Sequence, residues 1–328
     1  ISDRWDDWWD PPGGRNVSGE NSSSCSRPSR PRRVVRAGLL AAMLAAMVVP
    51  GGLSGISYPP AVSVAPTVSY EVEAGTLSPL SRLSVADVNR DRRPDVLVAN
   101  PASGEISVLL ARSAGRLAPP RRVPATAGVS SVAAGDLDRD GKVDLVVGPE
   151  IAVLRGDGSG GFGAPVRAIA TPLYSVQPHG AVALADLNRD SFLDVVVLSL
   201  TAGVMSILGD GTGALTLRYC CTPVHRVGGK WIVFAIGGLN SDTYPDVAVL
   251  EENPAEGYVT VMFGDGVGNF GSYAGRSVSP ARKVSQAVIG DFYGDSHLDL
   301  AVMDDGLERI YGFEGDGLGG FTFKAGSD

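Results

Sequence analysis

A nine-residue acidic pattern recurs five times along the chain, and this repetition restricts the fold more than any other feature of the sequence. Its copies read DVNRDRRPD, DLDRDGKVD, DLNRDSFLD, GLNSDTYPD and DFYGDSHLD, beginning at residues 87, 136, 186, 238 and 291. Successive copies are 49 to 53 residues apart. A period near fifty residues indicates one supersecondary unit that is repeated along the chain.

A glycine-rich motif follows the acidic pattern at a nearly fixed distance. It reads GDGSGGF, GDGTGAL, GDGVGNF and GDGLGGF, beginning at residues 156, 209, 264 and 315, which is 20 to 26 residues after the start of each acidic copy. The first unit carries only the divergent ARSAGRL at 111–117. Two motifs in constant phase favour a common structure for all five units.

The segments between the motifs have the composition of short strands. In the second unit they are VSSVAAG (129–135), VDLVVG (143–148), IAVLRG (151–156) and FGAPVRAIA (162–170). Such runs of Val, Ile, Leu and Ala, bounded by Gly, Pro and Asp, are typical of strands. No sustained helical period follows residue 58. We therefore predict an all-β fold, a β-propeller built from about five four-stranded blades.

The N-terminal region has the pattern of an export signal. Residues 28–36 are basic, residues 37–49 are apolar and uncharged, and small residues follow. This order predicts a signal peptide, or a short anchor, over 28–57. The apolar run falls short of the roughly 20 residues that a membrane span needs, so no stable span is expected. Residues 58–328 are then the propeller domain of a secreted protein, extracellular or periplasmic.

Residues 1–27 are predicted to be a disordered segment. Because they precede the signal and no methionine comes before Met43, we expect that the sequence begins upstream of the natural start or is a fragment. The net charge of −8 and the pI of about 5.0 argue against a nucleic-acid partner.

The cysteines are not expected to form a disulfide framework. Cys25 precedes the signal, and Cys220 and Cys221 are adjacent, a spacing that strains a disulfide ring. An exported chain without a disulfide framework must be stabilised by its core or by a metal.

The acidic pattern is suited to a cation. When the nine positions are numbered from 1, side-chain oxygens stand at positions 1, 3, 5 and 9, and position 7 can add its backbone carbonyl. Oxygen ligands in this number suit Ca²⁺, whereas transition metals favour His or Cys. Gly141, at position 6, permits the positive φ of a tight turn. An EF-hand would need Glu at position 12, where the second unit has Val147.

The alternative is a set of solvated Asx turns without metal, which repetition in a fixed phase makes the weaker interpretation. Three loops have every oxygen position, whereas Gly238 at position 1 and Tyr293 at position 3 leave the last two loops incomplete. We expect structural calcium in three strong sites and two weak or empty ones. The predicted metal ligands are Asp87, Asn89, Asp91, Asp95, Asp136, Asp138, Asp140, Asp144, Asp186, Asn188, Asp190, Asp194, Asn240, Asp242, Asp246, Asp291, Asp295 and Asp299.

The stretch VAAGDLDRDGKVDLVVG, followed by GDGSGGF, resembles the FG-GAP (VCBS-type) repeat, which also builds the propeller of integrin alpha subunits and of many bacterial secreted proteins. The resemblance covers roughly residues 67–328. It implies that the acidic loop joins the first two strands of a blade and binds Ca²⁺, and that the glycine-rich motif turns into the last strand. Family propellers often have seven blades. The five copies therefore fit either a complete five-bladed ring, closed by residues 67–74, or a fragment of a larger propeller.

No catalytic constellation is recognisable in the sequence. The histidines are His179, His225 and His297, and the last of these stands at position 7 of the fifth loop. We predict a secreted calcium-binding module for carbohydrate or protein, involved in binding or adhesion. The alternative is an extracellular polysaccharide hydrolase or lyase that uses the propeller as a scaffold. Trp231 and Tyr219 are the large aromatic residues that we would examine first as part of a ligand pocket.

Residues 155–157 spell Arg-Gly-Asp, an integrin-recognition tripeptide. Gly-Asp-Gly recurs in all four clear copies of the glycine-rich motif, so only Arg155 is unusual. The motif is better explained as a turn than as an adhesion signal.

Overall fold

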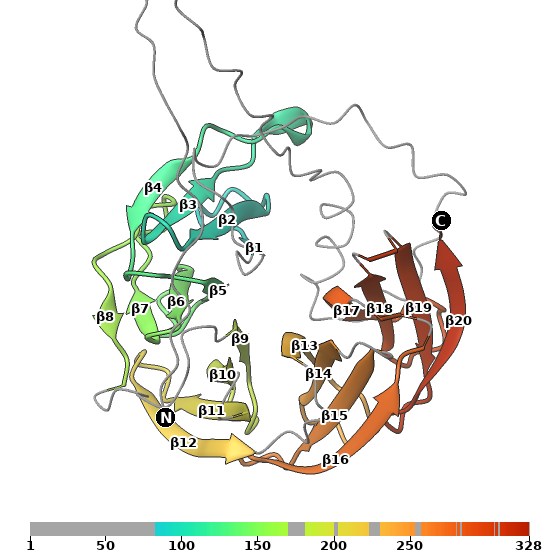
Figure 1. The fold of residues 1–328 in the computed structure, drawn as a ribbon. Helices are drawn as coiled ribbons and strands as arrows, with labels where there is room; N and C mark the ends of the chain where they lie inside the picture. Colours follow the sequence, from blue (N-terminus) through green and yellow to red (C-terminus); the bar gives the residue numbers. More distant parts are fainter. Residues whose placement is uncertain are drawn as a thin grey trace, which may run out of the picture. The chain divides into compact units, whose positions relative to one another are not determined.

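The structure is a computed structural model, and its described part contains five four-stranded antiparallel sheets (Figure 1). Each sheet is formed by four strands that are consecutive in the sequence, as expected for the blades of a multi-blade β-propeller. The predicted all-β propeller class is confirmed. All described residues belong to a compact unit spanning Arg36–Asp328. The described residues are 83–169, 181–199, 203–222, 230–252, 257–279, 281–282, 284–304, 306–307 and 309–327.

The blades are numbered 1 to 5 in chain order. Blade 1 consists of β1 (Leu83–Ala86), β2 (Asp95–Asn100), β3 (Glu105–Leu109) and β4 (Arg121–Pro124), with the short 3-10 helix η2 (Ser113–Gly115) before β4. Blade 2 consists of β5 (Ser131–Gly135), β6 (Asp144–Gly148), β7 (Ala152–Leu154) and β8 (Val166–Arg167). Blade 3 consists of β9 (Ala181–Ala185), β10 (Asp194–Ser199), β11 (Gly203–Gly209) and β12 (Leu215–Thr222). Blade 4 consists of β13 (Lys230–Gly237), β14 (Asp246–Glu252), β15 (Tyr258–Gly264) and β16 (Phe270–Ser277). Blade 5 consists of β17 (Val284–Gly290), β18 (Asp299–Asp304), β19 (Arg309–Gly315) and β20 (Phe321–Ser327).

The register of the first two strands places the acidic loop at the same point of every blade. The last residue of the first strand pairs with the aspartate at loop position 9, as Gly135 does with Asp144 and Ala185 with Asp194. The acidic loop is therefore the connection between the first two strands. The glycine-rich motif connects the third strand to the fourth in blades 2 to 5. Both placements agree with those implied by the family resemblance.

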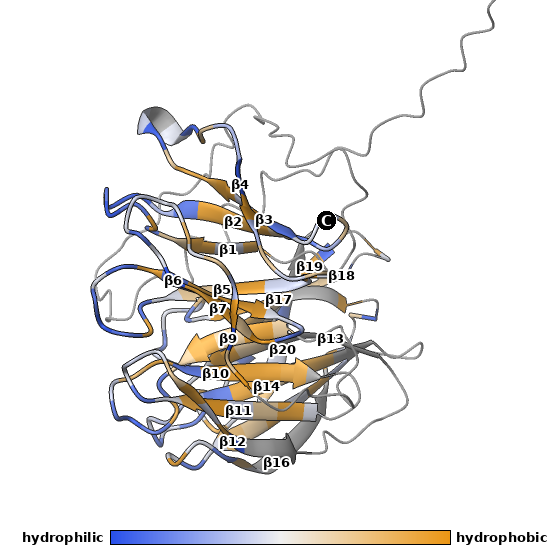
Figure 2. Cartoon of the chain, turned by 90° about the vertical axis from the view of Figure 1, so that its left-hand side faces the viewer, coloured by the Kyte–Doolittle hydropathy of each residue, from blue (hydrophilic) through white to orange (hydrophobic). Residues whose placement is uncertain are grey.

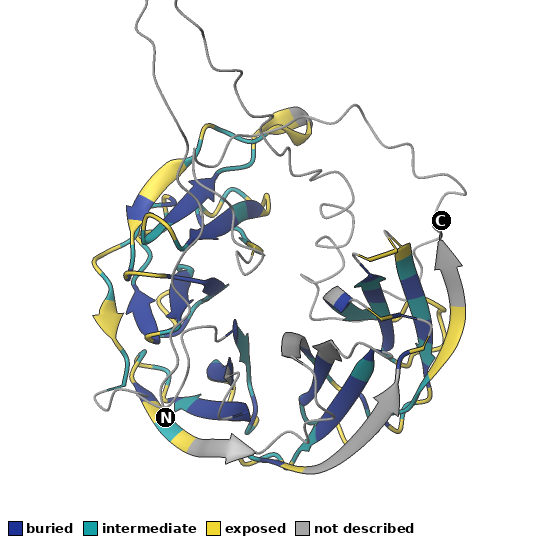
Figure 3. Ribbon diagram, viewed as in Figure 1, coloured by how far each residue is buried: buried dark blue, intermediate teal, exposed yellow. Residues whose placement is uncertain are grey.

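The second strand of a blade is buried on both faces. Leu145 and Val147 of β6 pack with Leu97 in a cluster shared with blade 1, whereas Val146 packs with Val195 of blade 3. Alternate residues of one strand thus contribute to the cores on either side of the blade, which explains its continuous apolar sequence. Figure 3 shows this burial along the middle strands, and Figure 2 shows polar connections at their ends. Each such side chain contributes about 1.5–3 kcal/mol when fully buried.

Contacts between blades follow chain order. The first strands of successive blades lie side by side, in the pairs β1 with β5, β5 with β9, β9 with β13 and β13 with β17. Within the described ranges, no helix has the length and apolar character needed to cross a membrane. The predicted segments 1–27, 28–57 and 67–74, together with His179 and His225 and the side chains of Trp231, Tyr219, Cys220 and Cys221, lie outside the described part.

Candidate metal centres

The five acidic loops share one backbone course. They are called loops 1 to 5 here and span residues 87–95, 136–144, 186–194, 238–246 and 291–299. Position 6 has a positive φ in every loop, and the five residues there are Arg92 (64°), Gly141 (78°), Ser191 (69°), Thr243 (76°) and Ser296 (73°). A positive φ at this position was predicted only for loop 2, which has Gly141 there. In the other loops a non-glycine residue adopts the left-handed conformation, at a cost of about 1–2 kcal/mol.

The position-1 aspartate explains how this turn is held. Its carboxylate accepts a hydrogen bond from the N–H of position 6, for example from Ser191 to Asp186 at 2.8 Å and from Gly141 to Asp136 at 2.9 Å. Side chains at positions 3 and 5 add the hydrogen bonds of Asx turns, such as the N–H of Lys142 donating to Asp140 at 2.8 Å. The loops therefore contain the Asx turns that sequence analysis considered as the alternative to a metal site.

The position-9 aspartate fastens each loop to the end of the third strand. In loop 3, Asp194 Oδ2 accepts from the N–H of Leu187 at 2.8 Å, and Oδ1 accepts from the N–H of Gly209 at 2.9 Å. Sequence analysis assigned this residue to a metal alone, because a bond between positions 15 residues apart depends on strand register. The same double contact is made by Asp95 (Val88 and Ala111), Asp144 (Leu137 and Gly156), Asp246 (Leu239 and Gly264) and Asp299 (Phe292 and Gly315).

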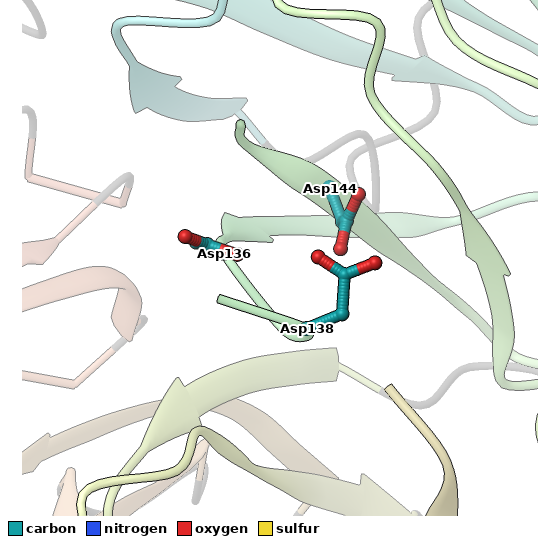
Figure 4. Close-up of side chains that lie close together, drawn as sticks. All are labelled: Asp136, Asp138 and Asp144. Carbon is teal, nitrogen blue, oxygen red and sulfur yellow. The ribbon is translucent and has the colours of Figure 1, made fainter. Parts of the chain in front are cut away.

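Two loops contain a buried carboxylate oxygen without a hydrogen-bond partner. These atoms are Oδ1 of Asp136 in loop 2 and Oδ1 of Asp186 in loop 3. In loop 2, ligand atoms of Asp136, Asp138 and Asp144 all lie within 4.8 Å of one another (Figure 4). An unpaired buried carboxylate oxygen is destabilising, and converging carboxylates repel one another. A set of oxygen donors with an open valence fits a hard cation such as Ca²⁺.

Loop 3 is short of positive charge. Among the described residues, no Lys or Arg side chain forms an ion pair with Asp186, Asp190 or Asp194. The pKa of the Asp194 carboxyl is raised to about 6, mainly by burial and to a smaller extent by the charges of Asp190 and Asp186, against the hydrogen bonds from Gly209 and Leu187. Burial likewise raises the pKa of Asp95 and of Asp246. Loop 3 therefore combines a buried carboxylate, an unpartnered oxygen and carboxylates that form no ion pair with Lys or Arg within the described residues, since Arg189 of this loop stacks on Tyr244 instead.

In metal-stripped protein, we expect Asp194 to make the fold less stable as the pH rises from about 4 to about 6. Its pKa is about 6 in the folded state and 3.8 ordinarily, so the folded chain holds this proton more tightly than the unfolded chain. Release of the proton across this window lowers the free energy of unfolding by on the order of 3 kcal/mol. Asp194→Asn removes the titrating group.

Urea unfolding of both proteins across this pH range measures the effect. The difference in free energy of unfolding between the variant and wild type should shift in favour of the variant as the pH increases. Parallel curves would show that Asp194 does not titrate in this range. Because the amide of asparagine donates where the carboxylate accepts, a constant offset between the curves is also expected, and it does not alter the slope.

Loops 4 and 5 each lack one side-chain oxygen, as the sequence predicts. Asn240 in loop 4 donates through Nδ2 to Asp242 at 2.8 Å. In loop 5, both carboxylate oxygens of Asp291 accept backbone hydrogen bonds, Oδ1 from Gly294 at 2.6 Å and Oδ2 from Ser296 at 3.1 Å. His297 is exposed, and its Nδ1 lies 3.4 Å from Asp295 Oδ2. These two loops offer a cation fewer free oxygens than loop 3 does.

The glycine-rich turn also joins neighbouring blades, which sequence analysis did not foresee. The N–H of Gly160 in blade 2 donates to the carbonyl of Val88 in loop 1 at 3.1 Å, and that of Gly319 in blade 5 donates to Leu239 in loop 4 at 2.9 Å. A Cβ on Gly160 would lie 2.8 Å from Leu110 of the preceding blade. The third glycine of the motif, which recurs in all four clear copies, was the available signal, because close backbone approach is one reason for a glycine.

The carboxylate of the Arg-Gly-Asp tripeptide is engaged within its own turn. Asp157 Oδ1 accepts hydrogen bonds from the N–H of Ser159 at 2.7 Å and of Gly161 at 2.9 Å, and these bonds lower the pKa of Asp157. The predicted explanation as a turn agrees with this geometry.

Comparison with protein families confirms the repeat class. The model of the FG-GAP-like repeat matches residues 87–147 and 238–302, which contain loops 1, 2, 4 and 5. These two regions are FG-GAP-like repeats, and the chain is a β-propeller built with such repeats. A comparison with curated protein sequences finds no match.

Solved structures share the fold at low sequence identity. The periplasmic gluconolactonase of Pseudomonas aeruginosa is similar with a TM-score of 0.51 and 19% identity, over 73% of this chain and 68% of the other. A lectin of Agrocybe aegerita that recognises non-reducing terminal N-acetylglucosamine has a TM-score of 0.48 and 17% identity. That alignment covers 75% of this chain and 65% of the lectin. At such identities, the likeness to the gluconolactonase shows the fold alone.

Proposed function

We propose that the chain is an exported, calcium-stabilised propeller that binds a carbohydrate or protein ligand. The observation that carries the calcium assignment is the unpartnered, buried Oδ1 of Asp186, in a loop whose carboxylates have no cationic partner among the described residues. Asp186, Asn188, Asp190 and Asp194 would hold the ion, together with the backbone carbonyl of Phe192. Export rests on the signal-like pattern of residues 28–57.

The role of the ion is structural in this proposal. Calcium supplies positive charge, while the chain provides a loop already fixed by the bond from Ser191 to Asp186 and by the two bonds to Asp194. An ion that binds only the folded chain stabilises it by about 2.7 kcal/mol when the free ion is at 100 times its dissociation constant. Extracellular calcium modules with dissociation constants of roughly 10⁻⁴–10⁻³ M set the concentration range to explore.

The test is thermal unfolding of the full chain, stripped of metal and titrated with calcium, with magnesium as a second cation. We expect the midpoint to rise with calcium. Asp190→Asn should reduce that rise by removing a ligand charge from loop 3. Asp210→Asn is the matched control, because Asp210 lies in the turn of the same blade and accepts from Thr212 instead. An unchanged midpoint at millimolar calcium would refute the proposal.

The ligand is tested on the same protein. A glycan array run with calcium and with chelator should show calcium-dependent binding if the module binds carbohydrate. Release of reducing ends from the glycans bound would instead favour the alternative, an extracellular polysaccharide hydrolase or lyase.

A further inference from the structure

Arg155 lies between two of the predicted calcium ligands of loop 2. Its Nη1 is 2.9 Å from Asp138 Oδ2 and 2.8 Å from Asp144 Oδ2, so one nitrogen contacts positions 3 and 9 together. Asp144 is almost fully buried, with 2% of its side chain exposed. A calcium ion bound through these two oxygens would need the place that the guanidinium occupies.

The same side chain is anchored in the next blade. Arg155 Nη2 donates to the carbonyl of Thr212 in blade 3 at 3.1 Å. The adjacent Gly213 makes room for it, because a Cβ there would lie well within 3.0 Å of the guanidinium. Held at both ends, the planar guanidinium is positioned before any ion arrives, which reduces the entropy lost in pairing.

Three of the other four repeats place an uncharged side chain at the corresponding position before the turn, and the fifth has Glu314, which pairs with Lys324. Leu110 packs against Gly160 of the following blade, and Leu208 packs against Gly268. Arg155 makes the same approach to its glycine but brings a positive charge. Phe263 occupies this position in blade 4 and packs against Gly319.

Loop 2, which Arg155 contacts, differs from loops 1 and 3 at one ligand position. Position 3 is asparagine in loops 1 and 3 (Asn89 and Asn188) but aspartate in loop 2, and this Asp138 is one of the residues that Arg155 contacts. A second cation, Lys142, pairs with Asp140 Oδ2 at 2.6 Å. Four carboxylates in loop 2 thus face two ion-paired cations, whereas the three carboxylates of loop 3 form no ion pair among the described residues.

We propose that Arg155 takes the place of calcium in loop 2, so that this loop is held by a cation from the chain itself. The inference rests on the proposed function, since it divides the loops into calcium-filled and arginine-filled ones. Loop 2 then remains folded in calcium-free surroundings, and its cation also ties blade 2 to blade 3. The unpartnered Oδ1 of Asp136 is the ligand that calcium would gain once the guanidinium is gone.

The test compares calcium stoichiometry by isothermal titration of the metal-stripped full chain. Arg155→Leu carries the residue found at positions 110 and 208, so the packing between blades is kept. Arg167→Leu is the control of equal charge in the same blade, because Arg167 pairs with Glu150 at 2.9 Å rather than with a carboxylate of an acidic loop. A double variant, Arg155→Leu with Asp138→Asn, reproduces the ligand set of loop 3.

Arg155→Leu and the double variant should each bind one calcium ion more per chain than wild type, and Arg167→Leu should not. If wild type binds calcium and Arg155→Leu binds the same number, the inference fails while the proposed function stands. If wild type binds none and Arg155→Leu binds one, the inference stands and the calcium assignment of loop 3 fails. If none of the proteins binds calcium, both fail.

Discussion

Asp246→Ala is expected to lower the free energy of unfolding by about 3–5 kcal/mol, since it removes a buried carboxylate that accepts three hydrogen bonds, one buried and two partly buried. Asp246 is fully buried and accepts from the N–H groups of Leu239 at 2.7 Å, Asn240 at 3.1 Å and Gly264 at 2.9 Å. Alanine leaves these donors without a partner and opens a small cavity. Urea unfolding measures the loss.

Loop 4 is chosen because Gly238 replaces its first carboxylate, which weakens any contribution from calcium. The measurement is made with chelator, so a loss seen there belongs to the hydrogen bonds. Asp242→Ala is the matched control, as the carboxylate of this exposed aspartate accepts two hydrogen bonds within the described residues, from the N–H of Tyr244 at 2.9 Å and from the Asn240 amide at 2.8 Å. We expect it to lose about 1 kcal/mol or less. Equal losses for the two variants would contradict the role given to Asp246.

Gly264→Ala is expected to destabilise the protein by about 3 kcal/mol or more, because backbone atoms fill the space that its Cβ would need. The added Cβ would lie well within 3.0 Å of the Pro245 carbonyl oxygen, a contact that real Cβ atoms essentially never make. Displacing Gly264 also disturbs its hydrogen bond to Asp246. The first glycine of the other clear copies meets the corresponding carbonyl, and these pairs are Gly156 with Val143, Gly209 with Leu193 and Gly315 with Leu298.

Gly271→Ala serves as the control in the same blade. Gly271 is exposed, has no positive φ, and a Cβ there meets no heavy atom within 4 Å. Its effect should stay within about 0.5 kcal/mol. If both alanine variants unfold at the same urea concentration, the packing of the first glycine against the loop carbonyl is not a restraint on the fold.

The sequence predicted the architecture because its repeats carry strand and turn signals in constant phase. The segments 129–135 and 143–148 correspond to β5 and β6, with ends that agree within about two residues. Apolar composition and bounding glycines are local properties, so they can be recognised without knowing which strands pair. The left-handed φ at Gly141 was predictable for the same reason.

Contacts made across register could not be predicted in this way. Arg155 follows β7 and forms ion pairs with Asp138 and Asp144 of loop 2. It also donates a hydrogen bond to Thr212 of blade 3. The direction of a long side chain at a strand end depends on the neighbouring backbone. It therefore cannot be predicted from the spacing of the repeats. The left-handed conformation of Ser191 was missed because its residue type does not favour it, and only the surrounding hydrogen bonds impose it.

Loops 1 and 4 each bind the glycine-rich turn of the following blade, in addition to bringing carboxylates together. Because Gly160 reaches the backbone of loop 1 and Gly319 that of loop 4, the rigidity of a loop is a property of two blades rather than one. Loss of a cation from such a loop would therefore weaken the contact between two blades. We expect the propeller to respond to falling calcium first at the contacts between blades, while the hydrogen bonds within each sheet remain.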